Sequence, residues 1–206
     1  MGLYDRYILP RIIEMGCGME VMQAQRERVV PQASGRVLEV GIGPGHNLAY
    51  YDPSRVEHVT GIDPSEPLLK LARERGSAVN FPVELVAQGA EDIPLPDASI
   101  DTVLVTFTLC TIPEVGASLA QMRRVLRPDG KLIFCEHGRS TDASVQRWQD
   151  RLNPLWNRLF GGCHLNRDMP ALIRGAGFRI DFLEADYLED TPRLAGYRTL
   201  GIAGIE

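Results

Sequence analysis

The stretch Arg36-Val-Leu-Glu-Val-Gly-Ile-Gly-Pro-Gly-His-Asn47 decides the fold of this chain. It begins with a short apolar run, residues 37–40, of the kind that forms a buried strand. Gly41, Gly43 and Gly45 follow, and a turn without Cβ atoms can bend tightly and approach a ligand closely. Glycine-rich turns also occur without any ligand, so the motif alone leaves a purely structural turn open.

A lone acid, Asp63, adds a second signal. It stands at the end of the next apolar run, residues 59–62. In nucleotide-binding α/β folds, an acid at this place accepts hydrogen bonds from ribose hydroxyls. We therefore expect a ligand with an adenosine-like part to lie across the first two strands. The alternative role for Asp63 is that of a helix cap.

Apolar runs alternate with segments of helical periodicity over the rest of the chain. Further strands are predicted at residues 83–87, 100–105 and 131–135, and two final strands at 178–183 and 197–202. Helices are predicted over 45–51, over 65–76 with Ser65 as a cap, over 115–126 and over 167–174, with a turn at 128–130. This alternation predicts a doubly wound α/β fold, with one seven-stranded, mostly parallel sheet and an antiparallel last strand.

The length of the chain favours a single domain over residues 1–206. Within it, residues 1–30 are expected to form a helical lid and residues 36–206 the core. The core carries a predicted helical insertion over about 143–160, which we expect to be broken near Pro154 because proline interrupts helices.

The composition of the chain limits the classes of partner and the cellular locations that we expect for it. The net charge of −5 argues against a nucleic-acid partner, whose phosphates attract basic surfaces. The four cysteines show neither metal-ligand spacing nor a disulfide framework, so we expect no metal and a reducing, cytoplasmic location. No apolar run approaches the ~20 residues of a membrane span, and no signal peptide is predicted. The oligomeric state stays open.

The Glu-Val-Gly-x-Gly-x-Gly pattern over residues 39–45 resembles motif I of class I S-adenosylmethionine-dependent methyltransferases. His46 stands where a dinucleotide-binding fingerprint has its third glycine. Residues 125–130, Val-Leu-Arg-Pro-Asp-Gly, and the loop at 90–96 are similar to later blocks of the same family. The resemblance implies a Rossmann-like methyltransferase fold and S-adenosylmethionine as the cofactor. A nicotinamide oxidoreductase and a non-catalytic cofactor-binding module remain the competing classes.

The resemblance also implies which residues contact the cofactor. Glu39 would orient the methionine ammonium, Asp63 would hold the ribose, and Thr106 would meet the methionine end. The full predicted set is Glu39, Gly41, Gly43, Gly45, Asn47, Asp63, Pro64, Ala90, Glu91 and Thr106. Gln88 stands at the start of the adenine loop where many members have glycine followed by an acid, so Gln88 or Glu91 would have to compensate. The alternative for Glu39 is a buried acid satisfied by backbone donors.

Three further blocks resemble the alkyl thiol methyltransferases of this family: residues 108–113, Glu136-His137, and residues 160–167. The same layout is shared with quinone and phospholipid methyltransferases. The resemblance implies a small, apolar acceptor, with a thiol as the first choice and a quinone-like or phenolic ring or a lipid amine as the alternative.

The acceptor side would be formed by residues from these blocks and from the lid. Cys110 and His137 are the candidate catalytic residues, with His137 as a base, and Tyr4, Tyr7, Cys163 and His164 are candidates for contact with the acceptor. The alternatives without a chemical role are a small buried apolar residue for Cys110, a structural histidine for His137, and a loop anchored by Gly161-Gly162 for residues 163–164.

Overall fold

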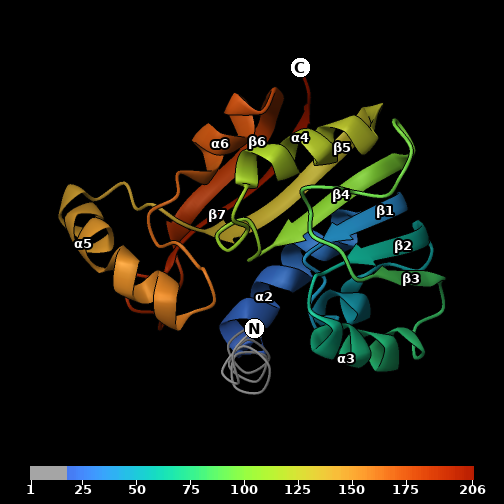
Figure 1. The fold of residues 1–206 in the computed structure, drawn as a ribbon, viewed down its shortest axis with the longest axis horizontal. Coiled ribbons are helices and arrows are strands. Elements are labelled where there is room, and N and C mark those ends of the chain that lie inside the picture. The colour runs from blue at the N-terminus through green and yellow to red at the C-terminus, as the bar shows by residue number, and fades with distance from the viewer. Residues whose placement is uncertain (1–17) are drawn as a thin grey trace.

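The computed structural model describes residues 18–206 and contains a seven-stranded sheet in the order β3-β2-β1-β4-β5-β7-β6 (Figure 1). The strands are β1 Gly35–Val40, β2 Val56–Ile62, β3 Val83–Val86, β4 Ile100–Thr106, β5 Leu126–His137, β6 Phe178–Tyr187 and β7 Tyr197–Ile205. The first five pair in parallel, and β7 runs antiparallel to both β5 and β6. The predicted fold class, including the antiparallel last strand, is confirmed.

Helices cover both faces of the sheet. They are α2 Glu20–Val29, α3 Glu66–Gly76, α4 Val115–Val125, α5 Ala143–Leu159 and α6 Met169–Gly175, with short 3₁₀ segments η2 Val30–Gln32 and η3 His46–Tyr50. On β1, Val37 packs in the cluster that includes α2 and α3, whereas Leu38 packs in the cluster with α4 and α6. This alternation is what a strand buried on both faces requires.

The helix predicted after the glycine turn is a 3₁₀ segment, η3, and it ends one residue early. Gly45 precedes it in the left-handed conformation, with φ of +82°. Tyr51 is already extended, with ψ of 140°, and its side chain is buried. Its hydroxyl reaches Glu39, so a tertiary contact takes the chain out of the helix at this point.

The predicted break at Pro154 is wrong, because α5 runs continuously through it. Buried Gln149 accepts from the Ser140 backbone and donates to the carbonyls of Gly138 and Leu194. Asn153 accepts from the Leu165 backbone. These bonds hold the helix on the N-terminal side of the proline, where its missing N–H leaves the backbone ladder one bond short. Figure 1 shows α5 projecting beyond the β6–β7 side of the sheet.

Two local predictions also need correction. Ser65 precedes α3, but its side chain makes no capping bond; instead Asp63 accepts from the Ser65 backbone at 2.8 Å. Residues 128–130, which were predicted to form a turn, are part of strand β5. There the register with β4 jumps from Ile100–Leu126 to Thr102–Lys131, so these residues bulge between two paired ends of one strand.

Residues 1–17, with Tyr4 and Tyr7, lie outside the described residues. The structure describes only residues 18–30 of the segment predicted to form a lid, and these include α2, so the lid stays a prediction. The last turn of α2 packs on the core through Val29. Among residues 18–206, none of the helices combines the length and the apolar character that a membrane crossing requires.

The anchoring of α5 by Gln149 can be tested through stability. Gln149→Ala leaves two buried backbone groups and one partly buried carbonyl without their partner, so the free energy of unfolding should fall by about 1–3 kcal/mol. Urea denaturation followed by circular dichroism measures the change. Gln23→Ala, which removes an exposed side chain with one bond to the Gly18 carbonyl, is the matched control. Equal effects of the two substitutions would contradict the anchoring role.

Candidate active site

The glycine turn after β1 leaves open space at its centre. Gly41, Gly43 and Gly45 have φ of +70°, +53° and +82°. A Cβ on Gly41 would collide with Thr108, and one on Gly45 would lie 2.9 Å from Leu48 Cδ1. A Cβ on Gly43 would meet only the Gly41 carbonyl oxygen, at 3.9 Å. The outer two glycines are therefore required by the protein's own packing, whereas the middle one borders a space that a ligand can fill.

Asp63 joins the glycine turn to the end of β2. Its Oδ2 accepts from the Gly43 backbone at 3.1 Å, and its Oδ1 accepts from the Ser65 backbone at 2.8 Å. Burial raises the pKa of this carboxyl, which is 9% exposed. A carboxylate has about four lone-pair sites, so Asp63 keeps capacity for the two hydroxyls of a ribose. Pro64 is exposed beside it.

Glu39 lies fully inside the sheet, 1% exposed, directly behind the turn. Its Oε1 accepts from Asn47 Nδ2 at 3.0 Å and its Oε2 from the Tyr51 hydroxyl at 2.7 Å. Side chains rather than backbone donors therefore satisfy it, unlike the alternative considered above. Burial raises its pKa to about 7, although both of these hydrogen bonds oppose the rise.

Asn47 links Glu39 to the end of β4. Its Nδ2 also donates to Thr106 Oγ1 at 3.0 Å, while its Oδ1 is buried and has no hydrogen-bond partner within the described chain. A buried acceptor without a donor is costly. An ammonium group placed over the turn would supply that donor beside the Glu39 carboxylate. The residues present thus fit the methionine end of S-adenosylmethionine.

The loop predicted to border adenine is partly closed. Ala90 is buried, and a Cβ on Gly89 would collide with the Glu91 carboxylate, which folds back over that glycine. Gln88 donates to Asp92 at 3.0 Å. Of the two groups expected to replace the family's acid, Gln88 is therefore tied to its own loop. Contact of Ala90 and Glu91 with adenine stays a prediction.

Buried Glu136 holds the loop after β4. Its Oε1 accepts from the backbones of Thr108 at 2.8 Å and Leu109 at 3.0 Å, and its Oε2 accepts from Cys110 at 3.3 Å. The chain bends sharply just before this loop, where Phe107 has a φ of +52°. Such a conformation is strained for a residue with a Cβ and persists only when its surroundings impose it. Sequence reasoning placed Glu136 in the Glu136-His137 block but gave it no role, although a charged residue directly after an apolar strand was a signal for one.

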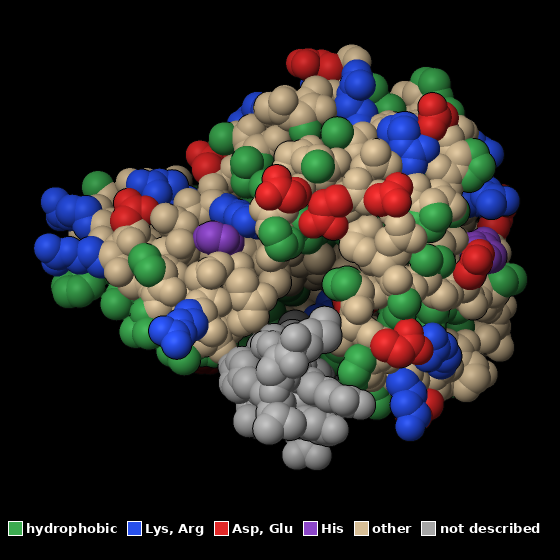
Figure 2. Space-filling model, in the orientation of Figure 1, with side chains coloured by type: hydrophobic (Ala, Val, Ile, Leu, Met, Phe, Trp, Pro, Cys, Tyr) green, Lys and Arg blue, Asp and Glu red, His purple; other side chains and the backbone are tan. Residues whose placement is uncertain are grey.

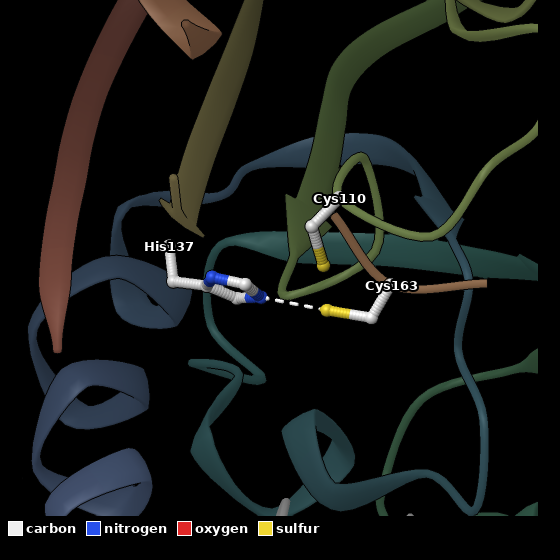
Figure 3. Close-up of side chains that lie close together, drawn as sticks. All are labelled: Cys110, His137 and Cys163. Carbon is white, nitrogen blue, oxygen red and sulfur yellow. Dashed lines mark hydrogen bonds between the residues drawn. The ribbon is translucent and has the colours of Figure 1, made fainter. Parts of the chain in front are cut away.

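Three predicted acceptor-side residues meet although they are far apart in sequence (Figure 3). Cys110 comes from the loop after β4, His137 from the end of β5, and Cys163 from the segment after α5. Their sulfur and nearest ring nitrogen atoms all lie within 4.8 Å of one another. His137 Nε2 and Cys163 Sγ are 3.0 Å apart. The adjoining Cys110 side chain and burial raise the pKa of Cys163, so its thiol is protonated at neutral pH.

The segment carrying Cys163 is bound firmly to its neighbours. The ring nitrogens of His164 lie 3.2 Å and 3.1 Å from the amides of Asn153 and Asn157 on α5. Its backbone donates to the Cys110 carbonyl at 2.8 Å, and Arg167 donates to the carbonyls after β4. His164 therefore anchors the loop, and its predicted contact with an acceptor stays a prediction. Figure 2 shows a hollow near the centre of this face, between the part formed by α5 and the part formed by α3.

The raised pKa of Glu39 predicts a pH-dependent stability. The folded chain binds this proton more tightly than the unfolded chain, so the free energy of unfolding should fall as the pH rises from 4.5 to 7. Glu39→Gln cannot titrate, so between pH 4.5 and 7 its free energy of unfolding should fall by less than that of the wild type. The difference should be on the order of 2–4 kcal/mol. Urea unfolding at several pH values measures it, with exposed Glu74→Gln as the control. Parallel curves for Glu39→Gln and the wild type would refute the assignment.

Comparison with known proteins adds independent support. A family model described as a methyltransferase domain matches residues 38–134. The human thiol S-methyltransferase TMT1A is 32% identical over 163 residues, which cover 77% of this chain and 66% of that protein. The phosphatidylethanolamine N-methyltransferase of Cereibacter sphaeroides is 36% identical, over 57% of this chain and 60% of that protein. This chain thus spans about three fifths to two thirds of the length of these relatives.

A solved structure shows the same fold. The S-adenosylmethionine-dependent methyltransferase from Aquifex aeolicus superimposes with a TM-score of 0.65 at 19% identity, covering 96% of this chain and 98% of that chain. The open glycine turn between two buried acids, the sheet order and these similarities place the chain in the class I methyltransferase family, whose cofactor is S-adenosylmethionine.

Proposed function

We propose that this chain transfers the methyl group of S-adenosylmethionine to the sulfur of a small, apolar thiol. The observation that carries the proposal is the position of the Cys110–His137–Cys163 cluster. The loop that bears Cys110 follows directly from Thr106, at the edge of the cofactor turn. A methyl donor in the turn and an acceptor beside the cluster would therefore be neighbours.

The relatives support a thiol without excluding other acceptors. Proteins named thiol S-methyltransferases are 32–36% identical to this chain. Relatives named for phosphatidylethanolamine and demethylmenaquinone are 36% and 34% identical, which keeps a lipid amine and a quinone ring as the alternative acceptors. The absence of a nucleic-acid partner and a cytoplasmic location remain predictions from charge and cysteine usage.

The end of the site at the glycine turn binds the cofactor and orients it. When bound, S-adenosylmethionine supplies a methyl group already activated by its sulfonium. Asp63 accepts the ribose hydroxyls, and Gly43 leaves room for the backbone to approach them. Asn47 Oδ1 and the Glu39 carboxylate receive the methionine ammonium. Alignment of this kind can contribute on the order of 7–11 kcal/mol to lowering a barrier.

The acceptor end places a nucleophile in line with that methyl group. A thiol has a pKa of ~8.5 and is partly ionised near neutrality, so it needs less help than an alcohol would. His137, whose Nε2 lies 3.0 Å from Cys163 Sγ, takes the remaining proton. Cys110 and Cys163 are small, polarizable side chains that contact the sulfur of the acceptor. Tyr4 and Tyr7, which lie outside the described residues, stay the predicted apolar cover.

The ribose role of Asp63 predicts weaker cofactor binding when its charge is removed. Asp63→Asn should reduce the affinity for S-adenosylhomocysteine by about 1–3 kcal/mol, because hydrogen bonds to a charged acceptor are lost. Isothermal titration calorimetry measures this, with exposed Asp129→Asn as the control that should bind like the wild type. Unchanged affinity would remove Asp63 from the ribose site, and binding of NAD instead would overturn the methyltransferase assignment.

The acceptor class can be read from a substrate panel. Alkyl thiols, phenols, a demethylated quinone and ethanolamine lipids are each incubated with the cofactor, and formation of S-adenosylhomocysteine is followed by mass spectrometry. Turnover should be fastest with apolar thiols, and methylated sulfur should appear in the product. Turnover confined to phenols, quinones or amines would replace the thiol by the alternative acceptor.

A further inference from the structure

We infer that Cys110, His137 and Cys163 bind a soft divalent metal ion, Zn²⁺ above all, and leave its fourth coordination position to the acceptor thiol. This inference rests on the proposed thiol acceptor and says how that acceptor is held. None of the cysteine spacings in the sequence indicates such a site, because the three ligands come from three distant segments.

The distances suit the ion. The three ligand atoms lie within 4.8 Å of one another, with His137 Nε2 and Cys163 Sγ at 3.0 Å. Around tetrahedral Zn²⁺, with Zn–S of ~2.3 Å and Zn–N of ~2.0 Å, such atoms are roughly 3.5–3.8 Å apart. Figure 3 shows the three side chains pointing toward a common centre. Shifts of less than an ångström would therefore complete the geometry.

Hydrogen bonds and strand pairing hold the three ligand residues in place before any metal ion binds. Glu136 and the His164 backbone hold Cys110 through its N–H and its carbonyl. His137 is paired with Arg198 of β7, and the Cys163 backbone donates to Phe160. The Nδ1 of His137 has no hydrogen-bond partner among residues 18–206, so only the contact of Nε2 with Cys163 restrains the ring, and that contact lies within the cluster itself.

The charges and the ligand count also fit. Two thiolates and one imidazole neutralise Zn²⁺, so the filled cluster carries no net charge into a buried site. The guanidinium of Arg167 donates to the Leu109 carbonyl, next to Cys110, and so adds a positive charge beside the cluster. Within the described part of the chain, the cluster offers three ligands rather than four. Three protein ligands with an open position are characteristic of catalytic zinc, whereas structural zinc is closed by four.

Coordination would prepare the acceptor for methylation. A thiol that binds the ion loses its proton to solvent and becomes a thiolate. The thiolate sulfur then forms a bond to the methyl carbon, the carbon–sulfonium bond breaks, and its electron pair stays on S-adenosylhomocysteine. The product thioether is a weaker ligand and can leave. In this form of the site the ion, rather than the His137 lone pair, takes over removal of the proton.

Cobalt substitution tests the site. The reduced, metal-free chain is titrated with Co²⁺, whose tetrahedral thiolate complexes show charge-transfer and visible absorption bands. One Co²⁺ should bind per chain, and Zn²⁺ should displace it. Cys163→Ser and His137→Asn should weaken binding at least tenfold. Cys135→Ala, which removes a buried cysteine outside the cluster, should bind like the wild type. Retained binding of S-adenosylhomocysteine shows that each variant is folded.

The outcomes separate this inference from the proposed function. Addition of an alkyl thiol should change the visible bands, whereas a phenol should not. Absent bands, or bands of equal strength in Cys163→Ser, would overturn the metal site. A metal-free chain that methylates thiols at the full rate would overturn it too, while leaving thiol methylation standing. Cobalt bands without methylation of any thiol would support the ligand set and remove the proposed function.

Discussion

The site depends on one buried carboxylate, that of Glu136. It accepts from three consecutive backbone N–H groups of the loop after β4, and it is wholly excluded from solvent. Loss of this acceptor would leave one partly buried and two buried donors unpaired, at a cost of about 1–3 kcal/mol for each buried one. These hydrogen bonds fix β4 to β5 at the edge where the glycine turn and the Cys110–His137–Cys163 cluster meet, and so they determine where Cys110 lies.

Burial of acids recurs across the site and has a common consequence. Glu39, Asp63 and Glu136 all have raised pKa values, and desolvation is the largest cause for each. Beside Glu39, the Oδ1 of Asn47 is one more acceptor, and it has no donor within the described residues. A cationic ligand would stabilise the charged form of these carboxyls and could donate a hydrogen bond to Asn47 Oδ1. The site is thus suited to the ammonium and sulfonium of the cofactor more than to the pyrophosphate of a dinucleotide.

Much of the fold could be predicted because its signals are local. The alternation of apolar strands and amphipathic helices, the left-handed glycines and the acid after β2 each act over a few residues. The failed predictions share a different cause. Tyr51 leaves η3 to reach Glu39, and α5 passes Pro154 because Gln149 and Asn153 anchor it. In each case a tertiary hydrogen bond outweighed a local preference.

The sequence by itself determined the α/β architecture, the glycine turn and the position of Asp63, because backbone conformation and strand periodicity are encoded by neighbouring residues. Only the tertiary structure decided that Cys110, His137 and Cys163 share one centre. Their separation along the chain carries no information about distance in space. That distance is set by the packing of β4 against β5 and by the amides of α5 that hold the loop containing Cys163.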